Sequence, residues 1–300
     1  MRVGLQLPWY SFPGWPESIP GTLRQLAVAA EGSGFASLWV MDHLFQLPEE
    51  TGWGGAGEPM LEAYTTLGAL SQVTSSIRLG AMVGGVHLRS PGLLVKAATT
   101  LDVLSGGRAY LGLGAGWYAR EATGLGIGWP SRPERFRMLE DTLRFVHHAW
   151  SGDRSRFHSA TVDAEEPIVV PSPISRPRPP ILIGGGGERR TLRLVAEYGD
   201  ACNILVPDPG ESRAKLAVLR RHCDEVGRDY ASIEKTSLIE ADLRPGRRTA
   251  EDVIVSIRAQ AEEGIEHVIL NMPDVHEPRY LDTFRDRVIP AVRDLQPTPA

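Results

Sequence analysis

Cysteine is scarce in this sequence of 300 residues, which contains only Cys202 and Cys223 and no CxxC pair. Two cysteines are too few for a disulfide framework, and their spacing gives no thiolate metal site. We therefore expect a reducing, cytoplasmic compartment. The sequence also lacks any apolar run near the roughly 18 residues of a membrane span. Its start, MRVGLQLPWY, has neither the basic region nor the long apolar stretch of a signal peptide, so we expect no membrane association.

Basic residues are also fewer than acidic ones. The sequence has 32 Lys and Arg against 37 Asp and Glu, a formal net charge of -5. This charge argues against a nucleic-acid partner, although it allows a local basic pocket. The adjacent His147 and His148 would point about 100° apart on a helix and could not bind one metal together. We predict no metal site.

The composition that remains, 42% hydrophobic and 23% charged residues, is typical of a globular protein. Short apolar runs alternate with segments of helical periodicity, which predicts parallel strands covered by helices. The expected strands span residues 3–8, 37–41, 77–83, 109–113, 181–183, 200–206, 233–241 and 267–271. The expected helices include 61–73, 136–150, 212–226, 249–263 and 278–295, with others ending at Gly34, beginning at Pro91 and passing through 192–195. Eight such pairs predict an α/β fold, a (β/α)8 TIM barrel, in a single domain of residues 1–300.

Residues 151–180 interrupt the alternation of strands and helices. This segment contains six prolines and several charges, so we expect an insertion between the fourth helix and the fifth strand rather than a separate domain. A small hairpin is expected around residues 168–170.

The stretch 101–121, LDVLSGGRAYLGLGAGWYARE, carries the strongest local signals. A helix ends at Ser105-Gly106-Gly107, a buried strand follows, and the strand stops at Gly114-Ala115-Gly116. Minimal side chains let another molecule approach the backbone, although a lone Gly-Ala-Gly is also typical of a plain turn. In a barrel, this loop shares one face with the loops 8–15, 42–43, 84–89, 184–190 and 203–207. We expect the functional site on that face.

Five segments follow one family pattern: SLWVMDH, IRLG, SPGLLVKAATTLDVLSGGRAYLGLGAGW with a later glutamate, ERFRMLEDTL, and PRPPILIGGGGERRTLRLVAEYGDACN. With them, nearly the whole chain resembles the bacterial luciferase-like superfamily, and more closely its coenzyme F420-dependent oxidoreductases. The resemblance implies a luciferase-like barrel that transfers hydride between the deazaflavin F420 and a small organic substrate at the C-terminal mouth. FMN is the alternative cofactor, in an FMN-dependent luciferase-like monooxygenase. A non-catalytic flavin-binding barrel is the alternative function.

The resemblance also implies where the cofactor binds. A bulge after the third strand, with a non-prolyl cis peptide at Met82-Val83, would support the ring. The run 184–187 at the start of a helix, with Arg189 and Arg190 nearby, would hold the phosphate, unless it is a flexible turn with solvated arginines. The expected cofactor-binding residues are Asp42, Met82, Val83, Gly84, Gly114, Ala115, Gly116, Arg120, Gly184, Gly185, Gly186, Gly187 and Arg189.

Asp42 and His43 follow the second strand, at the end where barrels place catalytic residues. In similar enzymes the aspartate lies toward the polar edge of the cofactor and the histidine toward the substrate. The resemblance therefore implies that both are catalytic and that His43 donates a proton, since histidine titrates near neutral pH. A structural histidine is the alternative.

The substrate pocket is expected to include Trp9, Trp117 and Tyr118. Sugar-phosphate dehydrogenases of this family carry a glutamate where this chain has Trp117, which argues against that activity here. Glu121 would shape the pocket or merely pair with a nearby arginine. Relatives commonly pair through barrel helices, so we also expect a homodimer.

Overall fold

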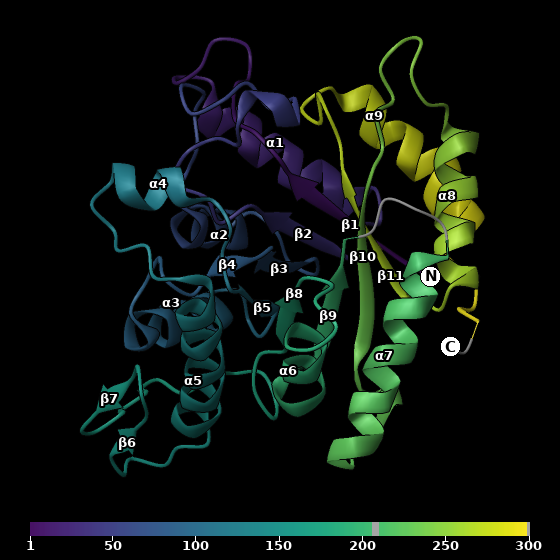
Figure 1. Cartoon of the computed structure of the whole chain (residues 1–300). Coiled ribbons are helices and arrows are strands. Elements are labelled where there is room, and N and C mark those ends of the chain that lie inside the picture. Colours follow the sequence, from purple (N-terminus) through teal and green to yellow (C-terminus); the bar gives the residue numbers. More distant parts are fainter. Residues whose placement is uncertain (206–209, 299–300) are drawn as a thin grey trace.

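A computed structural model describes residues 1–205 and 210–298, and in this part of the chain eight parallel strands close into a barrel (Figure 1). Each strand pairs with its neighbour in space, and the pairing of β3 with β5 closes the circle. The short strand β4 (Gly84–Gly85) extends the contact with β5. The barrel strands are β1 (Arg2–Leu7), β2 (Ser37–Val40), β3 (Arg78–Ala81), β5 (Ala109–Gly114), β8 (Ile181–Gly184), β9 (Ala201–Ile204), β10 (Glu234–Glu240) and β11 (His267–Asn271). The predicted (β/α)8 barrel is confirmed.

Helices surround the barrel because each buries one apolar stripe against the strands (Figure 1). In α5, for example, Leu139, Leu143 and Val146 are buried at helical spacing. The helices are α1 (Ile19–Gly32), α2 (Ala63–Ser71), α3 (Pro91–Leu104), α4 (Ala119–Gly124), α5 (Arg132–Trp150), α6 (Thr191–Tyr198), α7 (Glu211–Val226), α8 (Ala250–Glu262), α9 (Pro278–Thr283) and α10 (Ile289–Val292). Residues Phe284–Val288 form a π-helical link between the last two, and 3-10 turns cover Glu49–Thr51 and Tyr230–Ser232.

Two local expectations are corrected. The hairpin of the insertion is formed by β6 (Phe157–His158) and β7 (Asp163–Ala164), not by residues 168–170. Residues 168–170 lie between Pro167 and Pro171, which have no N–H group for a strand ladder. The expected third strand ends at Ala81, and Met82-Val83 is a non-prolyl cis peptide, as the family resemblance implied.

Other boundaries shift by a few residues, and α4 was not expected. The expected strand 200–206 and loop 203–207 run into residues that lie outside the described part of the chain. No helix in the described part is long and apolar enough to cross a membrane. The expected homodimer stays a prediction.

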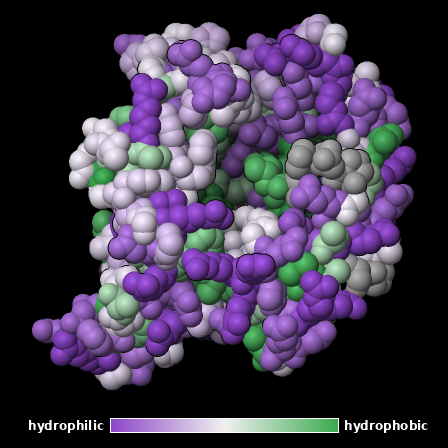
Figure 2. All heavy atoms as spheres, viewed as in Figure 1, coloured by the Kyte–Doolittle hydropathy of each residue, from purple (hydrophilic) through white to green (hydrophobic). Residues whose placement is uncertain are grey.

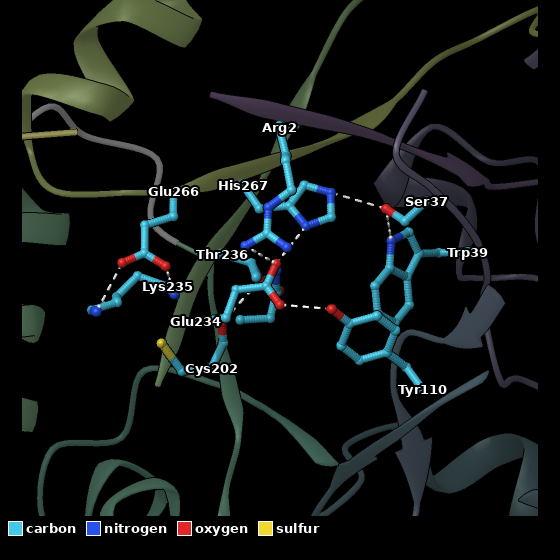
Figure 3. Close-up of polar contacts among 11 residues, drawn as sticks. Arg2, Ser37, Trp39, Tyr110, Cys202, Glu234, Lys235, Thr236, Glu266 and His267 are labelled. Carbon is cyan, nitrogen blue, oxygen red and sulfur yellow. Dashed lines mark hydrogen bonds and ion pairs between the residues drawn. The ribbon is translucent and has the colours of Figure 1, made fainter. Parts of the chain in front are cut away.

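A network of polar side chains links several barrel strands at their amino ends (Figure 3). Glu234 accepts hydrogen bonds from the Tyr110 hydroxyl and from His267 Nδ1, each at 2.7 Å, and pairs with Arg2 at 3.0 Å. His267 Nε2 lies 2.9 Å from the Ser37 hydroxyl. Burial opposes ionisation of Glu234, but His267 and Arg2 outweigh it and lower the pKa of Glu234 to about 2. The network therefore stabilises the folded state through an ionised, fully bonded carboxylate.

Replacing this carboxylate by an amide should destabilise the fold. We expect Glu234→Gln to lower the free energy of unfolding at pH 7 by about 2–3 kcal/mol in urea denaturation. Because the folded-state pKa is lowered, the stabilisation is complete above the unfolded pKa near 4.5 and is lost as the pH falls toward 2. The difference between wild type and variant should therefore shrink over that range. Glu240→Gln, at the exposed end of the same strand, is the matched control, and an equal loss in both variants would contradict the assignment.

Candidate functional site

The carboxyl ends of the barrel strands meet at one mouth, where Figure 2 shows a hollow in the surface between α4 and α8. The loops after β2, β3, β5 and β8 reach this mouth. They carry most of the residues that the sequence singles out. In the described part of the chain, no three His, Cys, Asp or Glu side chains are grouped as metal ligands would be.

Asp42, the second residue after β2, is held in a buried ion pair. Arg89 contacts both of its carboxylate oxygens, Nη1 to Oδ2 at 2.5 Å and Nη2 to Oδ1 at 2.9 Å. Arg89 also hydrogen-bonds Glu62 and lies over the ring of Tyr64, 5.0 Å from its centroid. Burial would lower the pKa of Arg89, but the two carboxylates raise it above its usual value. The side chain of Asp42 is thus fixed and charge-compensated, and sequence reasoning did not single out Arg89.

His43 is oriented by a second buried carboxylate. Its Nδ1 lies 2.9 Å from Oε1 of Glu121, and Oε2 of Glu121 accepts the backbone N–H of Leu44 at 2.7 Å. Glu121 is 1% exposed, whereas the His43 side chain is 14% exposed. The alternative that Glu121 merely pairs with an arginine is wrong, because its carboxylate accepts from donors of the loop after β2. With Nδ1–H donated to Glu121, Nε2 is the ring atom left for a ligand or a proton.

Aromatic side chains form a wall beside His43. Trp117 and Tyr118 stack with centroids 5.3 Å apart, and their rings lie 5.6 and 6.0 Å from the imidazole. Trp117 is 57% exposed, while Tyr118 is buried. These contacts bring His43, Trp117 and Tyr118 together as expected. Trp9 is partly buried, and its place in the pocket stays a prediction.

Val83 packs against Gly114 and Gly184, two of the expected cofactor-binding glycines. A Cβ built on Gly184 would lie 2.7 Å from Val83 Cγ2, and one on Gly114 would lie 2.9 Å from the same atom. A Cβ on Gly84 would lie 2.8 Å from Asp42 Oδ2. A side chain at Gly114 or Gly184 would displace Val83, and one at Gly84 would displace the carboxylate of Asp42. The structure therefore brings Asp42, Val83 and these glycines together at the carboxyl end of the barrel.

The glycine run after β8 differs in detail from the expectation. Gly184 ends the strand, the N–H of Gly185 donates to the Asn203 carbonyl at 3.0 Å, and α6 begins only at Thr191. A turn over residues 188–190 separates the run from the helix, so the glycines are not the helix start itself. The N–H groups of Gly186 and Gly187 donate to no described acceptor, and both residues line a cavity of about 570 Å³ with Arg189. Two free N–H groups beside a cation suit an anion.

The remaining expected residues lie on the loop after β5. Gly116 has φ +78°, and a Cβ there would lie 2.4 Å from the ring of His87. The Ala115 carbonyl accepts from Arg135 Nε at 3.1 Å, whereas Arg120 is exposed on α4. His87, which sequence reasoning did not single out, is 8% exposed, and neither of its ring nitrogens has a described partner. Burial lowers the pKa of His87, which favours the neutral form of the ring.

Comparison with known proteins gives one consistent family. The profile of the luciferase-like monooxygenase family matches residues 1–286. The chain is 26% identical to an F420-dependent glucose-6-phosphate dehydrogenase of Nakamurella multipartita, over 92% of this chain and 94% of that protein. It is 31% identical to the enzyme of the same name from Microbacterium testaceum, over 77% of this chain and 67% of that protein.

Solved structures share the fold. An F420-dependent secondary alcohol dehydrogenase in complex with an F420-acetone adduct superposes with a TM-score of 0.80 at 22% identity, covering 98% of this chain and 99% of that one. The coenzyme F420-dependent tetrahydromethanopterin reductase of Methanopyrus kandleri gives a TM-score of 0.77 at 16% identity, covering 96% and 98%.

The buried ion pair between Asp42 and Arg89 should contribute to the stability of the fold. Arg89→Met leaves the carboxylate of Asp42 buried without its cation, and we expect the free energy of unfolding to fall by about 3–5 kcal/mol in urea denaturation. The double variant Asp42→Asn, Arg89→Met removes the unpaired charge and should lose less than Arg89→Met alone. Arg285→Met is the control, because Arg285 also meets two carboxylates, those of Asp282 and Asp286, but at the exposed surface. Equal losses for the single and double variants would show that the charge of Asp42 is not what Arg89 offsets.

Proposed function

The chain belongs to the luciferase-like monooxygenase family, and from that we propose that it is an F420-dependent oxidoreductase acting on a small organic substrate at the barrel mouth. The observation that carries the proposal is the His43–Glu121 pair, which sets one imidazole nitrogen beside an aromatic wall at the carboxyl end of β2. Relatives named as F420-dependent enzymes, 26% and 31% identical, support the choice of cofactor.

The residues present fit such a cofactor. Gly114 and Gly184 leave room for Val83 to pack against their backbone, and we infer that the flat ring lies against Val83. The unpaired N–H groups of Gly186 and Gly187, with Arg189 beside them, suit its phosphate. When bound, F420 supplies a two-electron carrier that gives or takes hydride.

The protein's own contribution is proton transfer and positioning. Glu121 accepts from His43 Nδ1–H and so fixes the ring orientation and the tautomer. Nε2 of His43, when it carries a proton, can then give it to the substrate atom bonded to the carbon that receives hydride; without its proton, Nε2 can take one from that atom in the reverse direction. Asp42, tied to Arg89, holds a fixed charge next to Gly84 and keeps the loop after β2 in place.

The substrate is proposed from the wall beside His43. Trp117 offers an exposed aromatic face, which favours an apolar or conjugated compound over a sugar phosphate. Arg89 is already bound to two carboxylates and is not free to hold a substrate phosphate. We therefore do not extend the glucose 6-phosphate named for the relatives to this chain.

Two variants test the proton-transfer role once a substrate has been found by screening activated alkenes and imines with reduced F420. We expect His43→Ala to lower kcat by about 10²–10⁴-fold while F420 still binds. Glu121→Gln should lower kcat less, because the amide oxygen can still accept from Nδ1–H and orient the ring. His158→Ala, on the exposed hairpin, is the matched control. Turnover at the wild-type rate in His43→Ala would rule out this histidine as the acid.

The phosphate site is tested by a charge placed in the glycine run. Gly186→Asp fits the backbone, because the nearest atoms to its new Cβ are carbons of Lys215 at 3.7 and 3.9 Å. Its carboxylate would repel a phosphate, so we expect the Kd for F420 to rise by about tenfold or more while Tm stays near the wild-type value. Gly21→Asp, exposed near the start of α1, adds the same charge elsewhere. Unchanged F420 affinity in Gly186→Asp would place the phosphate elsewhere.

A further inference from the structure

His87 is a buried histidine that the proposed function has not used. It lies two residues after β4 and is 8% exposed. In the part of the chain that the structure describes, neither Nδ1 nor Nε2 has a hydrogen-bond partner. A neutral imidazole carries one donor and one acceptor, and leaving both unpaired in the interior costs free energy. Packing, without a described polar contact, therefore holds this ring in place.

Two glycines make room for the ring. A Cβ built on Gly116 would lie 2.4 Å from Cε1 of His87 and 2.7 Å from Nδ1, and one on Gly85 would lie 2.7 and 3.0 Å from the same atoms. Next to the ring, the backbone N–H of Val86 donates to the Gly114 carbonyl at 3.1 Å. One edge of the imidazole thus lies against both β4 and the loop after β5.

Trp129 and Arg135 complete a stack of three side chains, which we call the His87 stack. The ring of Trp129 lies nearly perpendicular to the imidazole, with centroids 4.8 Å apart, and the guanidinium of Arg135 lies 3.8 Å from the Trp129 centroid. Nε of Arg135 also donates to the Ala115 carbonyl at 3.1 Å. The His87 stack therefore contacts both Ala115 and Gly116.

The loop that the His87 stack contacts carries two residues of the candidate site. Trp117 follows Gly116 directly, and α4, which contains Glu121, begins at Ala119. Oε1 of Glu121 lies 2.9 Å from Nδ1 of His43 and orients that ring. A shift of Gly116 would therefore move both the aromatic wall and the carboxylate that fixes the imidazole of His43.

The packed position suits only an uncharged His87. A second ring proton would give the imidazole two N–H donors and a charge, with no acceptor among the described residues. Burial, the largest effect, lowers the pKa of His87; Glu121 opposes the shift, and Arg135 and His43 add to it. The carboxylate of Glu121 already accepts from His43 and from the loop after β2. Protonation should therefore displace the ring of His87.

We propose that His87 is a positioning residue, whose uncharged ring holds Gly116 and thereby Trp117 and Glu121 in the arrangement that the reaction needs, and whose protonation releases them. The effect on turnover rests on the proposed function, whereas the movement of the loop does not. Because the folded-state pKa of His87 lies below the usual 6.5, the loop is held above pH 6.5 and is released as the pH falls through the folded-state pKa.

Hydrogen–deuterium exchange with mass spectrometry tests the movement in the full chain without cofactor or substrate. Protection factors, which correct for the pH dependence of intrinsic exchange, are compared for residues 84–90 and 116–127. In the wild type both should fall by up to about tenfold for each pH unit below the pKa of His87, while those of α8 stay constant. In His87→Gln, which has no ionisable ring, this pH dependence should be lost.

Two further variants sharpen the test. His147→Gln is the matched control, because burial also lowers the pKa of His147, but that ring lies on α5 with Nε2 3.0 Å from the Tyr198 carbonyl. It should keep the wild-type pH dependence. Gly116→Ala places a Cβ 2.4 Å from the ring at a φ of +78° and should show low protection of the loop at every pH. Melting curves check that each variant is folded.

The kinetic readout is the ratio of kcat in His87→Gln to kcat in the wild type, which should rise as the pH falls below 6.5. A constant ratio would overturn the positioning role. Constant protection in the wild type down to about pH 5, or an unchanged pH dependence in His87→Gln, would overturn the movement itself. A wild type that binds no F420 would overturn the proposed function and leave the exchange result standing.

Discussion

The site depends on the hydrogen bonds that the buried carboxylate of Glu121 accepts. It accepts N–H groups from the His43 ring and from the backbone of Leu44, and so ties the loop after β5 to the loop after β2. A carboxylate that is 1% exposed needs such donors, because burying it unpaired would be costly. The same bonds that satisfy Glu121 fix the orientation of the imidazole. The hydrogen bonds of Glu121 therefore hold the loops after β2 and β5 together and also leave Nε2 of His43 available.

A second buried carboxylate, that of Glu234, links neighbouring segments through hydrogen bonds at the opposite end of the barrel. Glu234 gathers donors from Tyr110, His267 and Arg2 where the strands begin, far along each strand from the loops of the mouth. In barrels the amino end serves stability and the carboxyl end carries the chemistry. This separation lets the loops at the mouth contain bare glycines, unpaired N–H groups and an exposed tryptophan without loosening the fold.

The sequence predicted the barrel well because its signals are local. Apolar runs and helical stripes mark β5 and α5 within a few residues, whereas the hairpin of the insertion was misplaced because Ile168 and Val170 are apolar but exposed. At the site, glycines and strand ends indicated where a ligand binds. The partners of Asp42 and His43 were not predictable, because Arg89 and Glu121 lie 47 and 78 residues away and meet them only through the barrel's closure.

We propose that this mouth binds F420 in preference to FMN. The most direct measurement is a pair of binding titrations of the purified protein, one with F420 and one with FMN, under the same buffer and salt conditions. We expect saturable binding of F420 with a Kd below that for FMN. Binding of FMN that is equally tight or tighter would contradict it.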